Sequence, residues 1–442
     1  MVFPSIVVCP IRTPSWIFRD EAMEERPMPR MGKFPVFGKR FFRLARKLIG
    51  SCQFGHFWRI VVALAGMNGR RSLSRIEEAA KGRRSRQAIS HFLTQAEWDA
   101  PEVLRQTALD TLKSLGWRKG HTVYIAIDDT QKRKRAKRMD AVSKIFLHAE
   151  KVYAMGHTIV GCVLIYRGVV IPYAVRLWAC EEFCAGKQKV ARDDQPLKFR
   201  KLTELAADCV SQATLEAGKT IVLFDSYYLC PQVIKACENK GFHYVGVAKK
   251  NRNFFPDGRP HDKRRLGKYG ANVLRHDGRS IAVAGKKHRL AERVGRLSKA
   301  GRIKLAFSRR PRESSWIAMA TNETRWKAKT ILSHYLIRWG IEVLFKMSKQ
   351  YLGLGDYQVL RYRAVERYLH LVLIAYLLLT HLGIKMPDAQ ADQSNEKPLR
   401  LPSIPKLQQN LRLRLWQDAI QNMENGVRHR QVAKKIKDII ML

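Results

Sequence analysis

Acidic residues are scarce in this chain of 442 residues. Asp and Glu number 38 against 82 Lys and Arg, which leaves a formal net charge of +44 at pH 7. Such a field repels cationic partners and attracts polyanions, because neutralising phosphates releases condensed counterions. Hydrophobic residues make up 46% of the chain, so the charge does not imply disorder, and the length suggests two to four domains. We expect a folded, basic protein whose partner is nucleic acid.

Cysteines and long apolar runs are also few. Eight scattered cysteines exclude a disulfide scaffold and indicate reduced thiols. Cys180 and Cys184 have zinc-like spacing, but no second pair of Cys or His lies nearby in the sequence, so buried thiols are the favoured interpretation. The longest apolar run, 369–379, is broken by His370 and is shorter than the roughly 20 residues that cross a bilayer. It predicts a buried core helix, no membrane partner and a cytoplasmic location.

The N-terminal part of the chain reads as helical and basic. Residues 1–30 lack periodicity and are expected to be poorly ordered, whereas 31–118 form a helical region. Within it, the segments 73–80 and 83–93 flank Gly82 and resemble a helix-turn-helix. Arg83, Arg84 and Arg86 stand at the start of the second helix and predict DNA contacts. An ordinary helical pair with a solvated basic face is the alternative.

Beyond Gly120 the pattern changes to alternating strands and helices. A β-branched run, 122–127, predicts a buried strand that ends at Asp128 and Asp129 and leads into a basic loop. A second apolar strand, 220–224, ends at Asp225. The other expected elements are a hairpin of 158–166 and 169–179, helices at 199–216 and 232–239, and a strand at 242–248.

The second half combines a basic segment with long helices. Residues 251–300 hold 14 Lys and Arg against 4 Asp and Glu, which predicts an insertion between core elements or a flexible solvated loop. A strand at 316–320 and a continuous helix at 323–352 return to the core. A polar linker, 388–405, precedes two basic amphipathic helices at 406–421 and 427–440.

Two aspartates and one helix carry the candidate chemistry. Asp128 and Asp225 each follow an apolar strand, and side chains at strand ends of an α/β sheet point into the crevice where ligands bind. In the helix at 323–352, spacings of 3, 4 and 7 place four polar side chains on a stripe roughly 60° wide. These side chains are Tyr335, Arg338, Glu342 and Lys349. A solvated face with unrelated charges is the alternative for that helix.

Three carboxylates on separate elements suit hard divalent cations. Mg²⁺ prefers oxygen ligands and keeps positions open for water and phosphate. Two such ions about 4 Å apart can activate a water or a 3′-hydroxyl and stabilise the leaving oxygen. Arginine and lysine beside the acids would hold phosphates. The pattern therefore predicts metal-dependent phosphodiester chemistry, with two Mg²⁺ ions and Mn²⁺ as a possible substitute.

The segment YLIRWGIEVLFKMSKQ resembles the Tyr-x2-Arg-x3-Glu-x6-Lys signature of cut-and-paste DDE transposases from bacterial insertion sequences. IDDT and VLFDSYY are similar to the first and second aspartate motifs of that family, and the resemblance spans about 122–379. It implies a mixed α/β fold with a ribonuclease H-like core at 119–250 and 315–383. A basic, partly β insertion at 251–314 would interrupt this core, and a linker with C-terminal helices would follow at 384–442.

The resemblance also implies roles for residues. Asp128, Asp225 and Glu342 would bind the metal ions, while Tyr335, Arg338 and Lys349 would grip the phosphates of the transposon end. Asp129 directly follows Asp128, so the first ligand is open between them; Thr130 matches the family pattern that favours Asp128.

The expected function is transposition: binding of double-stranded inverted-repeat ends, hydrolysis there, and joining of the 3′-hydroxyls to target DNA. The resemblance also implies a homodimer that acts on paired transposon ends and is located at the bacterial nucleoid. Three alternatives stay open from the sequence: a nuclease or Holliday-junction resolvase of the same fold, a DNA-binding protein without cleavage, and an RNA-associated basic protein.

Overall fold

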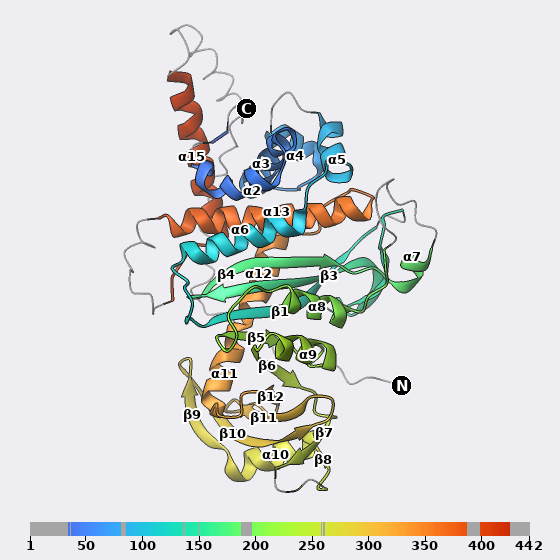
Figure 1. Ribbon diagram of the computed structural model, residues 1–442, viewed down its shortest axis with the longest axis vertical. Coiled ribbons are helices and arrows are strands. Elements are labelled where there is room, and N and C mark those ends of the chain that lie inside the picture. Colours follow the sequence, from blue (N-terminus) through green and yellow to red (C-terminus); the bar gives the residue numbers. More distant parts are fainter. Residues whose placement is uncertain are drawn as a thin grey trace.

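The computed structural model describes most of the chain beyond residue 33. The described residues are 34–35, 37–80, 85–135, 138–148, 150–186, 197–257, 259, 261–386 and 398–424. Figure 1 shows a layer of helices at one end, strands in the middle, and further strands with α10 at the other end. Residues 1–30, Arg83, Arg84, most of the expected linker and the helix expected at 427–440 lie outside the described residues.

The elements alternate as a mixed α/β fold, which confirms the predicted class. The helices are α1 (Gly38–Phe41), α2 (Arg43–Leu48), α3 (Ser51–Gly66), α4 (Leu73–Ala80), α5 (Arg86–Thr94), α6 (Ala100–Ser114), α7 (Glu181–Ala185), α8 (Leu202–Ser211), α9 (Pro231–Asn239), α10 (Leu266–Asp277), α11 (Ala328–Ile337), α12 (Trp339–Tyr351), α13 (Tyr362–Ile384) and α15 (Ile404–Glu424). The strands are β1 (Val123–Arg133), β2 (Ser143–Leu147), β3 (Val152–Tyr166), β4 (Val169–Leu177), β5 (Thr220–Phe224), β6 (His243–Ala248), β7 (Asn253–Pro256), β8 (Arg264–Arg265), β9 (Arg279–Val283), β10 (Lys286–Leu297), β11 (Gly301–Arg309) and β12 (Trp316–Thr321).

All twelve strands of the described residues belong to one sheet. Its order is β2-β3-β1-β5-β6-β12-β11-β10-β7-β8, with β4 on β3 and β9 on β10. β1, β5 and β6 run parallel, whereas β3 is antiparallel to β1. The hairpin predicted at Arg167 and Gly168 is present, and both residues have positive φ, as a tight turn between twisted strands requires.

The strand that carries Asp128 is longer than the apolar pattern predicted. β1 continues through Arg133 rather than ending at Asp128, because its pairing with β3 runs from Tyr124 to Arg133. Its parallel pairing with β5 stops earlier, at Ile127 opposite Phe224. Asp128 therefore lies in the middle of a strand, yet at the carboxyl end of the parallel part of the sheet.

The helix expected at 323–352 is broken in two. α11 ends at Ile337 and α12 begins at Trp339, and Arg338 stands between them. The amide of Arg338 donates to the Tyr335 carbonyl, and that of Ile341 to the Arg338 carbonyl, both with the three-residue spacing of a tightened turn. α11 packs on β6, β10, β11 and β12, whereas α12 packs on β1, β3 and β4. The break lets each half follow its own part of the sheet.

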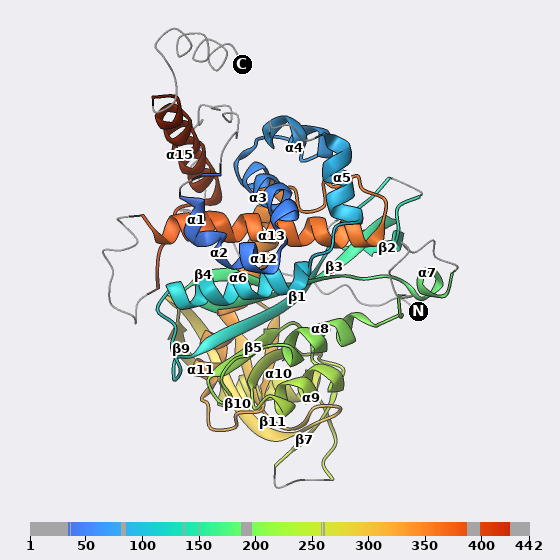
Figure 2. The same ribbon diagram turned by 45° about the horizontal axis from the view of Figure 1, so that its top comes forward.

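The helical layer rests on α13. Figures 1 and 2 show α3, α4, α5 and α15 on one side of α13, with β1, β3 and β4 on the other. α13 is longer than the predicted run, and it is the helix among the described residues that is long and apolar enough to cross a membrane. Of its most apolar window, 94% is buried inside the protein, which is the arrangement of a core helix.

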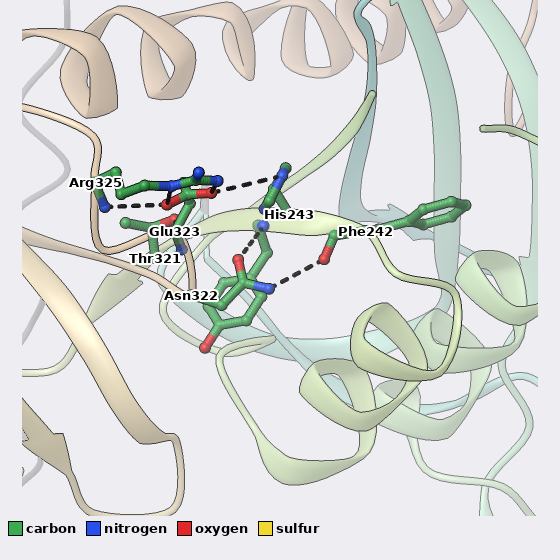
Figure 3. A network of polar contacts seen from close by, with 7 residues as sticks. Phe242, His243, Thr321, Asn322, Glu323 and Arg325 are labelled. Carbon is green, nitrogen blue, oxygen red and sulfur yellow. Dashed lines mark hydrogen bonds and ion pairs between the residues drawn. The ribbon is translucent and has the colours of Figure 1, made fainter. Parts of the chain in front are cut away.

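The basic segment after residue 250 extends the sheet. β7 to β11 join β6 through β12, and α10, which the sequence did not predict, packs on β10 and β11. Asn322, directly after β12, joins the end of this strand to the start of β6. Its side chain accepts from the Tyr244 amide at 3.0 Å and donates to the Phe242 carbonyl at 3.1 Å (Figure 3). Beside it, Glu323 pairs with Arg325 and lies 3.9 Å from His243, just before α11.

Candidate active site

Asp128 and Asp129 point to opposite faces of the sheet, since side chains alternate along a strand. Asp128 pairs with Gly161 of β3, and a Cβ on Gly161 would lie 2.6 Å from the Phe345 ring and 3.8 Å from Ile341. The face that carries Asp128 is therefore the face covered by α12. On the other face, the hydroxyl of buried Tyr228 donates to Asp129 Oδ1 at 2.9 Å.

The guanidinium of Arg338 joins Asp128 to Glu342. Its Nη1 donates to Asp128 Oδ2 at 2.6 Å, and its Nη2 donates to Glu342 Oε1. The three side chains are only 14%, 18% and 28% exposed for Arg338, Asp128 and Glu342. β1 and α12, which are far apart in the sequence, thus place an aspartate and a glutamate on the same cation. That cation, Arg338, lies in the turn between α11 and α12.

Asp225 completes the group from the neighbouring strand. It follows β5 directly after Phe224, which pairs with Ile127, so it stands next to Asp128 in the parallel register. Asp225 Oδ1 accepts from the amides of Tyr227 at 2.9 Å and Tyr228 at 3.3 Å. This turn holds the carboxylate at the start of the loop, as aspartate commonly does after a strand.

Burial and repulsion by neighbouring carboxylates make Asp128 and Glu342 hard to ionise. The pKa of Asp128 is raised to about 7, chiefly by burial; Arg338 opposes this rise, and Asp225, Asp129 and Glu342 add to it. The pKa of Glu342 is also raised, first by burial and then by Asp225, although Arg338 opposes this. One guanidinium therefore does not fully offset the negative charge of the cluster.

Tyr335 and Lys349 lie in the same region but are already engaged. The Arg338 guanidinium carbon is 5.6 Å from the centre of the Tyr335 ring. Lys349 Nζ donates to the Gln131 carbonyl of β1 at 2.8 Å, and burial lowers the pKa of this lysine. The structure thus gathers Tyr335, Arg338 and Glu342 around Asp128, while Lys349 fastens α12 further along β1.

The basic run after Asp129 is not a solvated loop throughout. Lys134 is buried, and its ammonium donates to the carbonyls of Gly355 at 2.7 Å and Tyr357 at 3.0 Å. Burial lowers the pKa of Lys134 to about 7. Lys132, still within β1, pairs with Asp356 at 3.5 Å. These lysines attach the segment after α12 to β1, a role that a run of consecutive basic residues does not reveal in the sequence.

Arg86 belongs to the helical layer. It is the first residue of α5, where Ser85 caps the helix by accepting from the Ala88 amide, and α5 packs on α3, α4 and α13. Sequence reasoning also missed Tyr228, which positions Asp129. The only signal for it is the aromatic pair that follows Asp225 in FDSYY.

The donor chemistry of the cluster fits a hard divalent cation. Asp128, Asp225 and Glu342 offer carboxylate oxygens in a desolvated place with excess negative charge. Among the described residues, however, no group of three or more His, Cys, Asp or Glu side chains is arranged so that it could hold a metal ion. In this arrangement the Arg338 guanidinium is the cation that bridges Asp128 and Glu342.

Comparison with known proteins places the chain in a family. A family model described as DDE superfamily endonuclease matches residues 53–330, more than half of the chain. The match includes Asp128 and Asp225 and ends before Glu342. No curated protein matches the sequence. The family has a ribonuclease H-like fold and nuclease activity on DNA, which agrees with the mixed sheet described above. The chain belongs to the DDE superfamily of endonucleases.

Proposed function

We propose that this DDE-family enzyme is a DNA transposase of the insertion-sequence group with the Tyr-x2-Arg-x3-Glu-x6-Lys signature. It would bind inverted-repeat ends, hydrolyse phosphodiester bonds there, and transfer the 3′-hydroxyl ends to target DNA. The observation that carries the proposal is the meeting of Asp128 and Glu342 on Arg338, with Asp225 on the adjacent strand. The spacing of Tyr335, Arg338, Glu342 and Lys349 supports the transposase over a general nuclease.

Asp128, Asp225 and Glu342 would hold two Mg²⁺ ions, for which Mn²⁺ is a possible substitute. When bound, such ions activate a water or 3′-hydroxyl and stabilise the leaving oxygen. Arg338 donates to Asp128 and Glu342 in the structure, and its planar fork suits a DNA phosphate equally well. Tyr335 lies beside Arg338 and would orient the guanidinium, and Lys349 would add charge near the phosphates of the end.

The substrate is double-stranded DNA, as both transposon ends and target, and the acting form would be a homodimer on paired ends. Arg83, Arg84 and Arg86 would contribute contacts from the N-terminal helices. The protein would work at the bacterial nucleoid in the cytoplasm.

The test is cleavage and strand transfer on DNA that carries the sequences flanking the gene, with Mg²⁺ present. Glu342→Gln should lower cleavage by at least about a hundredfold, because even loss of a partner outside the ligand shell costs 10–100-fold in metal sites. Glu238→Gln, an exposed acid on α9, is the matched control and should keep full activity. Undiminished cleavage by Glu342→Gln would remove Glu342 from the proposed triad.

The alternative is a metal-dependent nuclease of the same family that cuts without joining, and the endonuclease description of the matching family favours it as the second candidate. A joined product between the cut end and a target plasmid would decide for the transposase. Cleavage without any joined product would decide for the nuclease. Metal-independent binding with no cleavage at all would indicate a non-mobile DNA-binding protein.

A further inference from the structure

Exposed apolar side chains gather on the hairpin formed by β2 and β3. The large hydrophobic residues that are exposed among the described residues are Leu48, Phe146, Val152, Tyr153, Met155, Tyr227, Ile317 and Leu360. Half of this set lies on the one hairpin, and Tyr153 is the most exposed, at 69%. A concentration of this kind marks an interaction site, whereas single exposed hydrophobic residues are ordinary.

Four side chains of the hairpin share one face. Phe146 stands directly opposite Tyr153, and Lys144 directly opposite Met155. The Phe146 and Tyr153 rings meet edge to face with centroids 5.1 Å apart, and the Lys144 ammonium lies 5.7 Å from the centre of the Tyr153 ring. We call Lys144, Phe146, Tyr153 and Met155 the aromatic platform.

The platform lies on the sheet face that carries Asp128. Asp128 pairs with Gly161 of β3, and every second residue back along β3, through Met155 to Tyr153, faces the same way. Tyr153 is eight residues from Gly161, but the hairpin bends back toward β1, since His148 lies close enough to Asp129 to lower the pKa of that carboxyl electrostatically. The far end of β2 is also tied to β1, since the His148 amide donates to Gln131 Oε1 at 3.2 Å.

The charges around the platform favour a nucleic-acid occupant. Between 131 and 155, the exposed cations of the described residues are Arg133, Arg135, Arg138, Lys144 and Lys151, against Glu150 as the exposed acid. The central parts of protein–protein interfaces are depleted in lysine and other charges. Aromatic faces among cations are instead the arrangement that holds a nucleic-acid strand, with the bases stacked on the rings and the phosphates on the cations.

We propose that the aromatic platform binds unpaired bases of the DNA that flanks the reacting phosphate, by stacking on Tyr153 and Phe146 while Lys144 contacts the backbone. The inference rests on the proposed function for the identity of the DNA. Stacking needs no particular base, so the site would act on distorted DNA of any sequence.

The experiment compares two DNA probes that differ only in a short internal loop of unpaired nucleotides containing 2-aminopurine. Binding of the full chain is measured by fluorescence anisotropy, and stacking by quenching of the 2-aminopurine signal, both with a chelator instead of metal. Tyr153→Ala should weaken binding of the looped probe by about fivefold to a hundredfold, the range that stacking of one base on an aromatic ring provides. The same substitution should abolish the quenching of 2-aminopurine and leave the affinity for the fully paired probe nearly unchanged. Tyr153→Phe, which keeps an aromatic ring, should restore both the affinity and the quenching.

Ile317→Ala, which removes another exposed apolar side chain on β12, is the matched control and should behave like the unmodified protein. Equal affinity of Tyr153→Ala and unmodified protein for the looped probe would overturn the proposal. A change of oligomeric state in Tyr153→Ala, seen by light scattering without DNA, would assign the platform to a second copy instead. Neither measurement requires DNA cleavage. A protein that shows the stacking result but never cleaves DNA would therefore contradict the proposed function and leave the platform proposal standing.

Discussion

Arg338 occupies a place where two buried carboxyl groups need a cation. Its guanidinium donates to Asp128 and Glu342, and all three side chains are largely buried. Removing one partner of a buried ion pair is costly, about 3–5 kcal/mol, because the remaining charge is left uncompensated. The proposed role of Arg338 in holding a DNA phosphate therefore requires that another cation take its place on the carboxylates, which a divalent metal ion would provide.

The raised pKa of Asp128 predicts a pH dependence of stability. The folded state holds the Asp128 proton up to about pH 7, whereas the unfolded chain releases it near 3.8. Between these values the folded state binds more protons, so this group's contribution to the free energy of unfolding falls as pH rises, by about 4 kcal/mol in total. The contribution is complete below about pH 4 and lost above about pH 7.

Denaturant unfolding with a chelator present, from pH 4 to pH 8, checks this against Asp128→Asn. The asparagine cannot ionise but keeps an oxygen that accepts from Arg338. The unmodified protein should lose stability relative to Asp128→Asn up to about pH 7 and then run parallel to it. A gain relative to the variant over that range would mean that Arg338 outweighs burial and holds the pKa of Asp128 below its usual value.

At the scale of elements, the packing of α12 on β3 sets the position of Glu342. Gly161 permits that packing, because a Cβ there would lie 2.6 and 2.8 Å from atoms of the Phe345 ring. Gly161 is also the residue opposite Asp128. The separation between β3 and α12 depends on the absence of a side chain at Gly161. The distance between the carboxylates of Asp128 and Glu342 depends on that separation.

Gly161→Ala should therefore move α12 away from β3, at a cost of about 1–3 kcal/mol for overpacking. DNA cleavage should fall more than DNA binding, since the basic side chains away from α12 are unaffected while Glu342 leaves Asp128. Cleavage rates and anisotropy on the same DNA measure the two effects. The double variant Gly161→Ala, Phe345→Leu shortens the obstructing ring and should recover activity; a double variant no better than the single one would place the cause elsewhere.

A large share of the positive charge of the whole molecule lies in one stretch of the chain. Residues 251–350 contribute +18 of the total +44, including the strands β7 to β11 and α12. Part of this charge is neutralised within the protein, as in Arg293 with Asp277 and Lys304 with Glu292. The remaining positive charge favours binding of a polyanion.

DNA affinity should fall steeply with salt. For a protein that makes 6–10 phosphate contacts, affinity drops by about 10³ to 10⁵ between 50 and 200 mM salt. Anisotropy titrations across that range measure the slope, and uncharged dextran in place of salt controls for crowding. A nearly flat dependence would show that the charge serves a partner other than nucleic acid.

Much of the fold followed from local pattern. β5 has the predicted limits, and β6, β12 and α9 begin or end within a residue of them, because each is a short run whose apolar residues are bounded by turn signals. β2 and α10 were not predicted, since neither has a strong pattern of its own and each is stabilised by neighbours. β1 was predicted too short because polar residues after Asp128 remain in the strand through their pairing with β3.

The sequence by itself determined the polyanion partner, the mixed α/β class and the candidate residues, since charge, periodicity and spacing are properties of the chain. Only the tertiary structure decided that Asp128 and Asp129 face opposite sides, because pairing with β3 fixes which side α12 covers. It also decided that α11 and α12 separate at Arg338, because the two halves pack on different parts of one sheet. A straight helix would agree with the local sequence pattern, but it could not pack on both parts of the sheet.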